Sequence, residues 1–512
     1  MKLSDLLRFN AQHYGDKVAL RLNGQSWSFR ELHARVEDFC HTYGTVIEPT
    51  DRVALWFNNS INWLTAFIGI NALDAISVPI NTRLTVSEIK GILCETAPRA
   101  MLTVKNARNR DYYCEAREVI NAYRLQTVLI DADPSLWPRE WANERFASML
   151  APDVRTTDLD GLLCIQYTSG TTASPKGAML STHAYLATAN YVAKCQQLSP
   201  NSSFISAAPF FHCSGTMHAI TVCLLAGCTL NSIDIWDPDL FLWETQKYKC
   251  DVSHMIYFRD VLALNSPKAP DMLITLNVGH ELGTYDYLAR VKEELGIPGL
   301  SNLYGMTETC GQFTMWFADD DVQRRLGANG RPQPGNEIRI VEPGTDRTLA
   351  HGELGEIVMK GVTLTPGYFK KTRDDNSTWT DTGWLRSGDL GSLSECGELT
   401  YVARIKDVIR VGGENLAPAE VEQALREVCS VDQVCVLAMP HERLDQVPVA
   451  VICGKLVHSN ASLKARLKEQ LAGFKIPREI YLIDEMPLTA TNRVQKHLLM
   501  EWISQGKLST LS

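Results

Sequence analysis

The first half of the chain alternates short apolar runs with a longer stretch of helical spacing. Apolar runs at residues 52–57, 75–80, 100–104, 126–130 and 162–166 have the length of buried strands, and residues 60–73 have helical periodicity. Strands that alternate with helices of about 10–15 residues are typical of βαβ units around a largely parallel sheet. The pattern therefore predicts an α/β fold for this part of the chain.

The pattern changes twice after about Arg331. Residues 336–342, 352–361 and 397–405 are short alternating strands separated by glycines, which favours a small antiparallel barrel. From Ala417 onward, helices at 417–428 and 462–474 and strands at 431–440 and 447–454 predict a compact α+β domain. We expect a large N-terminal domain over residues 1–403 and a small C-terminal domain over 404–512, joined at the charged segment 403–407.

Composition narrows the class of protein. A chain of 512 residues is too long for a single core, so at least two domains are expected. The net charge of −9 argues against a nucleic-acid partner, which would need a basic face. Fourteen scattered cysteines without metal-binding spacing, and no signal peptide at the start, predict reduced thiols in the cytoplasm.

Residues 195–233 contain no Asp, Glu, Lys or Arg. A membrane helix would need about 20 consecutive apolar residues. This segment is interrupted by prolines, two histidines and many Ser, Thr and Asn, so it predicts buried core that could line a binding pocket, and no membrane span.

The stretch "YTSGTTASPKGA", Tyr167–Ala178, combines five Ser and Thr hydroxyls, two glycines and one lysine. Hydroxyls, exposed backbone N–H groups and one ammonium suit a polyphosphate, whose oxygens accept hydrogen bonds. An apolar run precedes the stretch and helical spacing follows it, which predicts a phosphate site at a helix N-terminus. The spacing of Gly170 and Lys176 excludes the GxxxxGK[ST] loop, so the site is not of the Walker type.

Three further clusters bear groups that could react or bind. "NLYGMTETC" offers a ring to stack on a base, a threonine for a phosphate, and the carboxylate of Glu308 for Mg²⁺. "GWLRSGDLG" places Asp389 in a glycine-flanked turn, where it could accept from ribose hydroxyls, and "PFFHCSGT" sets His212 among aromatic and small residues. Taken singly, each has an ordinary explanation as a turn aspartate, a solvated helix residue or a core histidine.

The order of these motifs, completed by "ARIKD" and "GGEN", resembles the adenylate-forming superfamily of acyl-CoA synthetases, peptide-synthetase adenylation domains and luciferases. The resemblance runs nearly end to end and is closest to the acyl-CoA ligases. It implies that the phosphates of ATP are held by Thr168, Ser169, Gly170, Thr171, Thr172 and Lys176. It further implies a nucleotide site of Asn302, Tyr304 against adenine, Thr307 at the α-phosphate, Glu308 on Mg²⁺, and Asp389 and Arg404 at the ribose.

The resemblance also assigns His212 to a gate beside the carboxylate substrate and Lys406 to the hinge of the small domain. Two positions depart from the family pattern. Ala173 stands where the family usually has glycine. In "PLTATNRVQK", Asn492 and Arg493 stand where the family reads T-G-K, and that lysine bridges the α-phosphate and the carboxylate.

The implied function is an ATP-dependent ligase that forms an acyl-adenylate, releases pyrophosphate and passes the acyl group to coenzyme A. We expect an apolar acid with one or few polar groups, because Phe210, Phe211 and Met217 would line the site without a lysine or arginine beside them. An amide-forming ligase that uses an amine acceptor stays open, as does an inactive adenylate-binding protein, motivated by Arg493. A luciferase-type oxygenase has no supporting residue, and a homodimer is left open.

Overall fold

The computed structural model describes residues 1–105, 107, 110–132, 161–167, 176–254, 257–371, 378–411, 414–429, 431, 433–454, 459–489 and 494–511. The chain divides into two compact units. The first comprises Met1–Glu337, Lys360–Ser377 and Gly397–Leu399, and the second comprises Ile338–Met359, Thr378–Cys396 and Thr400–Ser512. The domain boundary expected at residue 403 stays a prediction.

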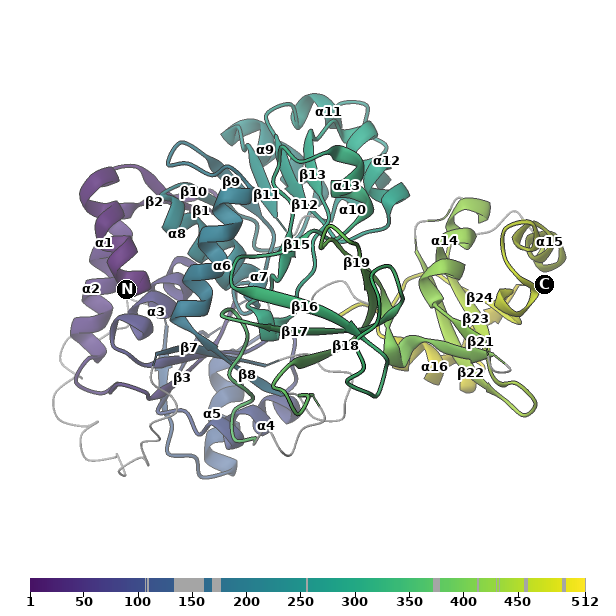
Figure 1. The fold of residues 1–512 in the computed structure, drawn as a ribbon. Helices are drawn as coiled ribbons and strands as arrows, with labels where there is room; N and C mark the ends of the chain where they lie inside the picture. Colours follow the sequence, from purple (N-terminus) through teal and green to yellow (C-terminus); the bar gives the residue numbers. More distant parts are fainter. Residues whose placement is uncertain are drawn as a thin grey trace. The chain divides into compact units, whose positions relative to one another are not determined.

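One sheet of the first unit confirms the predicted βαβ pattern (Figure 1). Its strand order is β6-β5-β3-β4-β7-β8, and the first five of these strands run parallel. The bounds are β3 Arg52–Trp56, β4 Ile76–Pro79, β5 Ala100–Thr103, β6 Val128–Asp131, β7 Leu162–Tyr167 and β8 Gly177–Ser181. The strand residues are apolar and mostly buried, as expected for a parallel sheet covered on both faces.

The segment after the phosphate stretch corrects the sequence prediction. A helix was expected directly after the loop, but Gly177–Ser181 first forms β8, which pairs antiparallel with β7. The helix, α6 Thr182–Cys195, begins only where the Ser181 side chain accepts from the backbone N–H of Ala184. The pairing with β7 gives residues 177–181 an extended partner, so the phosphate stretch joins two strands and not a strand and a helix N-terminus.

The second sheet of the first unit has the order β13-β12-β11-β9-β10-β1-β2. All neighbours in it run parallel except β1 and β2, which are antiparallel. The bounds are β1 Val18–Leu22, β2 Gln25–Ser28, β9 Ser203–Ser206, β10 Thr229–Ser232, β11 Val252–His254, β12 Val278–His280 and β13 Gly299–Ser301.

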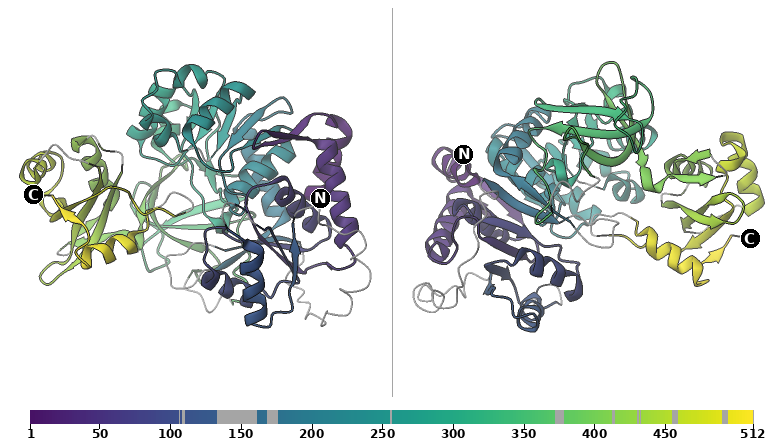
Figure 2. Two further views of the ribbon diagram at one scale, coloured as in Figure 1. Left: turned by 180° about the vertical axis from the view of Figure 1, so that it is seen from behind. Right: turned by 60° about the horizontal axis from the view of Figure 1, so that its bottom comes forward.

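Helices cover the faces of these two sheets (Figures 1 and 2). One shared core joins both sheets to the helices α1 Leu3–Tyr14, α2 Phe29–Tyr43, α3 Ile61–Ala72, α6, the π-helix η3 Thr216–Thr221 and α8 Val222–Ala226. The other face of the six-stranded sheet packs on α4 Val86–Thr96 and α5 Tyr112–Ala122. The other face of the seven-stranded sheet packs on α9 Pro238–Tyr248, α10 Phe258–Ala263, α11 Ala269–Met272, α12 Tyr285–Leu295 and α13 Val322–Gly327. A short pair, β14 Thr314–Met315 and β15 Arg331–Pro332, completes the unit.

The second unit contains the four-stranded sheet β16-β17-β18-β19, at the place where the sequence predicts short antiparallel strands. Its bounds are β16 Asn336–Val341, β17 Gly355–Gly361, β18 Leu385–Leu393 and β19 Leu399–Arg404, and β17 pairs antiparallel with β18. The strands lie in a linear order, with β16 and β19 at the two edges of the sheet.

The C-terminal part of the second unit is an α+β layer structure (Figure 2). Its sheet follows the order β21-β20-β23-β24-β25, and β22 also pairs with β23. The bounds are β20 Ile409–Val411, β21 Glu414–Leu416, β22 Val434–His441, β23 Asp445–Cys453, β24 Glu479–Ile483 and β25 Ser509–Thr510. The helices α14 Pro418–Cys429 and α15 Asn460–Gln470 share one core with this sheet, and α16 Lys496–Ser504 packs in a second. Within the described ranges, no helix has both the length and the apolar character needed to cross a membrane.

Candidate active site

Loops that leave the carboxyl ends of the seven-stranded sheet carry His212, Asn302, Tyr304, Thr307 and Glu308, candidates of the first unit. The loop after β9 leads to His212, and the loop after β13 leads through Tyr304 to Thr307 and Glu308. Carboxyl ends of parallel strands meet at one edge of a sheet, and ligands of open α/β sheets bind in the crevice outside that edge. The fold therefore brings two motifs that lie about 90 residues apart in the sequence to the same edge.

A line of contacts through Tyr368 connects Lys176, at the end of the phosphate stretch, to Glu308. The hydroxyl of Tyr368 donates to Oε1 of Glu308 over 2.7 Å, and Lys176 Nζ lies 5.1 Å from the centroid of the Tyr368 ring. Glu308 is buried, and burial together with its carboxylate raises the pKa of Tyr368, so this phenol keeps its proton. Through one side chain, the arrangement links a cation, which suits phosphates, to a carboxylate, which suits a hard metal ion.

The segment that carries Tyr368 also forms backbone hydrogen bonds to Glu308 and to Gly177, the residue after Lys176. The Thr365 N–H donates to the Glu308 carbonyl over 2.7 Å, and the Phe369 N–H donates to the Gly177 carbonyl over 2.8 Å. Sequence reasoning missed Tyr368. Its signal was the Pro-Gly-Tyr sequence at 366–368, a turn with a large aromatic residue that ends up buried.

We expect Tyr368→Phe to lower the rate of acid-dependent pyrophosphate exchange about tenfold or more. The substitution keeps the ring beside Lys176 but removes the hydroxyl that holds one oxygen of Glu308, and outer-shell partners of metal ligands typically contribute about 10- to 100-fold. Titration of Mg²⁺ should show a higher half-saturating concentration in the variant. An unchanged Mg²⁺ dependence would mean that Tyr368 does not orient Glu308.

Backbone hydrogen bonds join Tyr304 to residues 313 and 314, and so close the loop that contains Thr307 and Glu308. The Tyr304 carbonyl accepts from the N–H groups of Phe313 and Thr314 at 2.8 and 3.0 Å. A Cβ atom on Gly305 would lie 2.4 Å from the Gly311 carbonyl oxygen, so only glycine fits there. Thr307 then opens a single 3₁₀ turn, η4 Thr307–Thr309, which presents Thr307 and Glu308 side by side in the chain.

Asn302 lies on the same stretch, but its carboxamide bonds within the fold. Its Nδ2 donates to the Gly283 carbonyl over 2.7 Å, and its Oδ1 accepts from Leu303 N–H and from Asn329 Nδ2, both at 3.0 Å. These contacts suit a residue that positions the stretch. A direct contact between Asn302 and a nucleotide stays a prediction.

His212 caps the short helical turn α7 Cys213–Gly215. The Ser214 N–H donates to His212 Nδ1 over 3.2 Å, so Nδ1 acts as an acceptor and Nε2 carries the proton of the neutral ring. A Cβ atom on Gly215 would lie 2.2 Å from the Pro209 carbonyl oxygen, which is why the turn needs glycine. Phe210, Phe211 and Met217, predicted to line the acid site, are all buried around this turn.

The remaining described candidates lie in the second unit. Arg404 Nε is 2.8 Å from Oδ1 of Asp389, whose side chain is buried. Lys406 lies in the 3₁₀ turn η5 Ile405–Asp407, and partial burial lowers its pKa. Lys496 Nζ contacts Asp407 Oδ2 at 3.1 Å. The two predicted ribose ligands are therefore in contact, and Arg404 lies two residues before the predicted hinge at Lys406.

Several predicted residues fall outside the part of the chain that the structure describes. These are Thr168, Ser169, Gly170, Thr171 and Thr172 of the phosphate stretch, and Arg493. Ala173 and Asn492, the two other departures from the family pattern, fall outside it as well.

Glu281, which directly follows β12, is a further perturbed carboxyl that the motifs did not indicate. Phe258 N–H donates to its Oε2 over 3.2 Å, and burial raises its pKa to about 8, although Tyr287 and Arg259 oppose this. Between the unfolded value of about 4.5 and about 8, the unfolded chain loses this proton while the folded chain keeps it. The contribution of Glu281 therefore makes the protein less stable as pH rises through that window.

We expect Glu281→Gln to remove this pH dependence. The melting temperature of the parent should fall more between pH 5 and pH 8 than that of the variant, because one pKa unit corresponds to about 1.4 kcal/mol. Parallel curves for the two proteins would show that Glu281 titrates normally in the folded state.

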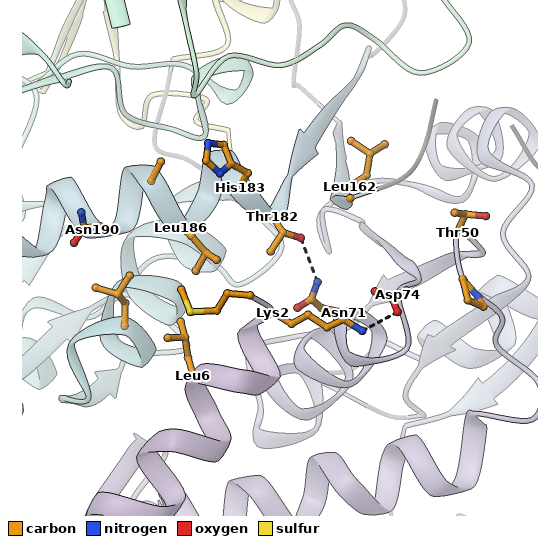
Figure 3. A pocket seen from close by; sticks show the side chains of 15 residues that line it. Lys2, Leu6, Thr50, Asn71, Asp74, Leu162, Thr182, His183, Leu186 and Asn190 are labelled. Carbon is orange, nitrogen blue, oxygen red and sulfur yellow. Dashed lines mark hydrogen bonds and ion pairs between the residues drawn. The ribbon is translucent and has the colours of Figure 1, made fainter. Parts of the chain in front are cut away.

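A pocket of the first unit lies away from these residues (Figure 3). Its volume is about 950 Å³, and none of the predicted site residues lines it. Figure 3 shows Lys2 directed at Asp74, at 2.7 Å, and Asn71 directed at Thr182. Four polar residues of this pocket thus pair within its lining.

The fold and the grouped residues define a nucleotide-dependent α/β enzyme with a separate C-terminal unit. The chain belongs to the AMP-binding enzyme family: that family matches residues 7–369, and the AMP-binding enzyme C-terminal domain matches residues 420–493. The expected resemblance to adenylate-forming enzymes, with the acyl-CoA ligases nearest, is confirmed.

Three similar proteins indicate the branch of the family. A putative acyl-CoA synthetase, YngI, of Bacillus subtilis is 30% identical, with 97% of this chain and 96% of that protein covered. The 3-[(3aS,4S,7aS)-7a-methyl-1,5-dioxo-octahydro-1H-inden-4-yl]propanoyl:CoA ligase of Rhodococcus jostii is 29% identical, with 97% of each chain covered. The solved O-succinylbenzoate coenzyme A synthetase (MenE) of Bacillus subtilis, in complex with ATP and magnesium ion, is 25% identical, with a TM-score of 0.81 over 97% of this chain and 99% of that one.

Proposed function

We propose that this protein activates a carboxylic acid as acyl-AMP, with release of pyrophosphate, and transfers the acyl group to coenzyme A. The observation that supports it best is the line from Lys176 through Tyr368 to Glu308, because it joins the phosphate stretch to a buried carboxylate. Membership in the family and similarity to CoA ligases over nearly the whole chain support the same reaction. ATP is a substrate of this reaction.

The residues fit Mg²⁺ as the ion bound with ATP. Glu308 offers a buried carboxylate with Oε1 already oriented by Tyr368, and carboxylate oxygen is a preferred Mg²⁺ ligand. The part of the chain that is described contains no group of three His, Cys, Asp or Glu side chains able to hold a metal ion. Mg²⁺ usually binds through one or two carboxylates, waters and substrate phosphates. When bound, the ion supplies charge stabilisation on the phosphate oxygens.

In the first half-reaction, the acid carboxylate attacks the α-phosphorus in line, and pyrophosphate leaves. Lys176 and the phosphate stretch would hold the leaving group, and Thr307 would donate to the α-phosphate. Tyr304 would lie against adenine, while Asp389 would accept from the ribose hydroxyls with its carboxylate oriented by Arg404. His212, with its proton on Nε2, would stand beside the acid.

In the second half-reaction, the thiol of coenzyme A attacks the acyl carbon and AMP leaves. We propose that the small C-terminal domain turns about Lys406 between the two steps, as hinge closures do in other enzymes. A homodimer and a cytoplasmic location stay predictions. An amide-forming ligase is the second candidate, but the relatives named above are CoA ligases or synthetases.

The first test is isotope exchange between pyrophosphate and ATP. We expect exchange only when both a carboxylic acid and Mg²⁺ are present, because the acyl-adenylate must form before the reverse reaction can return label to ATP. Omission of the acid and chelation of Mg²⁺ are the two controls. If a broad acid panel gives neither exchange nor AMP, the proposed function is wrong.

A further inference from the structure

Five neighbouring strands of the seven-stranded sheet all end in a polar residue. Ser232, Ser206, His254, His280 and Ser301 are the last residues of β10, β9, β11, β12 and β13. They pair in register across the sheet: Ser232 with Ser206, Ser206 with His254, His254 with His280, and His280 with Ser301. Residues directly opposite each other in neighbouring strands point to the same face. We name these five residues the polar row.

A sixth polar side chain covers the polar row. His218, on the π-helix η3, stacks on His254 with ring centroids 4.0 Å apart and an interplanar angle of 11°. Its Nε2 lies beside Gly311, whose backbone carbonyl accepts a hydrogen bond from the ring. Short π-helical turns frequently occur at functional sites. Because Gly311 closes the turn that begins at Thr307, the polar row lies next to the motif that would hold the α-phosphate.

Four of these six side chains retain a buried polar atom without a partner among the described residues: His218 Nδ1, His254 Nδ1, Ser232 Oγ and Ser301 Oγ. All four residues are at most 2% exposed. His280 is satisfied, because its Nδ1 meets Gln196 Nε2 at 2.9 Å. Unsatisfied buried polar groups are costly, and a cluster of them is uncommon in a core that serves packing alone.

The hydrogen-bond donors and acceptors of these six side chains determine which ligand group could bind to them. Because His218 uses one nitrogen as donor to the Gly311 carbonyl, its Nδ1 holds a lone pair that needs a donor. The serine hydroxyls can donate or accept. A hydroxyl group, which donates one hydrogen bond and accepts others, matches this set.

A charged group does not match the cluster. Burial lowers the pKa of His218 and His280 to about 3 and holds the pKa of His254 well below its ordinary value, so the rings are neutral. Residues 195–233, which supply His218, Ser206 and Ser232, contain no charged side chain. Arg325, whose charge acts on His280, gives its guanidinium to the backbone carbonyls of Asp320, Leu300 and Pro298. The face-to-face rings of His218 and His254 also do not converge on a metal ion.

We infer that the acid activated by this enzyme carries an uncharged hydroxyl group on an otherwise apolar body, and that the polar row with His218 binds that hydroxyl. The inference rests on the proposed function, since it concerns the acid of that reaction. It agrees with the expectation of an apolar acid with few polar groups, and the unpartnered atoms that would bind the hydroxyl are those of His218, His254, Ser232 and Ser301.

The test compares matched acids in the pyrophosphate-release assay. 3-Cyclohexylpropanoic acid and octanoic acid are each compared with their hydroxylated, oxo and carboxylated derivatives, the substituent being moved along the ring or chain. We expect at least one hydroxylated acid to exceed its parent in kcat/KM by about tenfold or more, since sites built to bind a hydroxyl discriminate strongly against analogues without it. The carboxylated acids should be the poorest substrates.

Two variants assign the effect to the polar row. His254→Phe keeps a ring for stacking, and Ser301→Ala removes one hydroxyl. Each variant should lower, at least threefold, the ratio of kcat/KM for the hydroxylated acid to kcat/KM for the acid without the hydroxyl. Ser77→Ala is the matched control, because Ser77 Oγ is also buried and without a described partner but lies on β4 of the other sheet. In Ser77→Ala, the ratio of kcat/KM for the hydroxylated acid to kcat/KM for the acid without the hydroxyl should equal that of the unsubstituted enzyme. Without substrate, Ser301→Ala should melt no earlier than the parent, since its hydroxyl is unpaired.

The outcomes separate the two hypotheses. If acids without a hydroxyl or with a second carboxylate are activated best, or if the ratio survives in both variants, the inference is overturned while the proposed function stands. If no acid releases pyrophosphate, the proposed function itself fails.

Discussion

Glu308→Gln should reduce acid-dependent pyrophosphate exchange by about two to three factors of ten, similar to the removal of one transition-state stabilising donor in other enzymes. The substitution keeps the size of the side chain and an oxygen that can accept from Tyr368, but it removes the negative charge. Glu308 is buried and is the carboxylate of the first unit nearest in sequence to Thr307. The loss should therefore appear as a loss of Mg²⁺ binding in the ATP complex.

A matched variant distinguishes this effect from loss of folding. Glu281→Gln replaces another carboxyl near the same sheet edge and should leave the Mg²⁺ dependence unchanged, because Glu281 bonds to the Phe258 N–H on the side of α10. Melting curves of both variants check the fold. If Glu308→Gln catalyses exchange at the same rate as the unsubstituted enzyme, Glu308 is not a ligand of the metal ion.

Arg493→Ala should depress adenylation by one or more factors of ten, each worth about 1.4 kcal/mol of barrier. Arginine keeps the charge of the family lysine, so stabilisation of the α-phosphate is retained. Its planar fork binds oxygens in pairs, however, and is not equivalent to a single ammonium that bridges two partners. Arg493→Lys should for this reason raise the exchange rate.

The second half-reaction provides the internal control for Arg493. Transfer from a pre-formed acyl-adenylate should change little in either variant, since we expect the small domain to have turned this segment away by then. Equal adenylation rates in the parent and Arg493→Ala would show that Arg493 does not replace the lysine. Equal losses in both half-reactions would indicate a structural role.

Local sequence pattern predicted the strands of the six-stranded sheet other than β8. The apolar runs at 52–57, 75–80 and 100–104 form β3, β4 and β5, because a strand buried on both faces needs nearly continuous apolar residues. The same reasoning failed at residues 177–181. The run from Ala178 has helical spacing, but pairing with β7 decides its conformation, and long-range pairing leaves no mark in local periodicity.

Motif order predicted the family, whereas contacts between motifs came only from the structure. Tyr368 is buried between Lys176 and Glu308, and no spacing in the sequence links it to either. The polar row was equally hidden, because its five residues come from five separate strands and share only their position at the strand ends. The sequence predicted the uncharged segment 195–233 as buried core, and most of its residues are buried, but the stacking of His218 on His254 depends on sheet register.

The most direct test of the central claim is identification of the product by mass. The enzyme is supplied with ATP, Mg²⁺, an acid that supports exchange, and coenzyme A and a mixture of amines in the same reaction. We predict one acyl-CoA thioester formed in amounts equal to the AMP released, with no amide above the level seen without enzyme. Accumulation of an amide with coenzyme A unconsumed would contradict the assignment as an acid–CoA ligase.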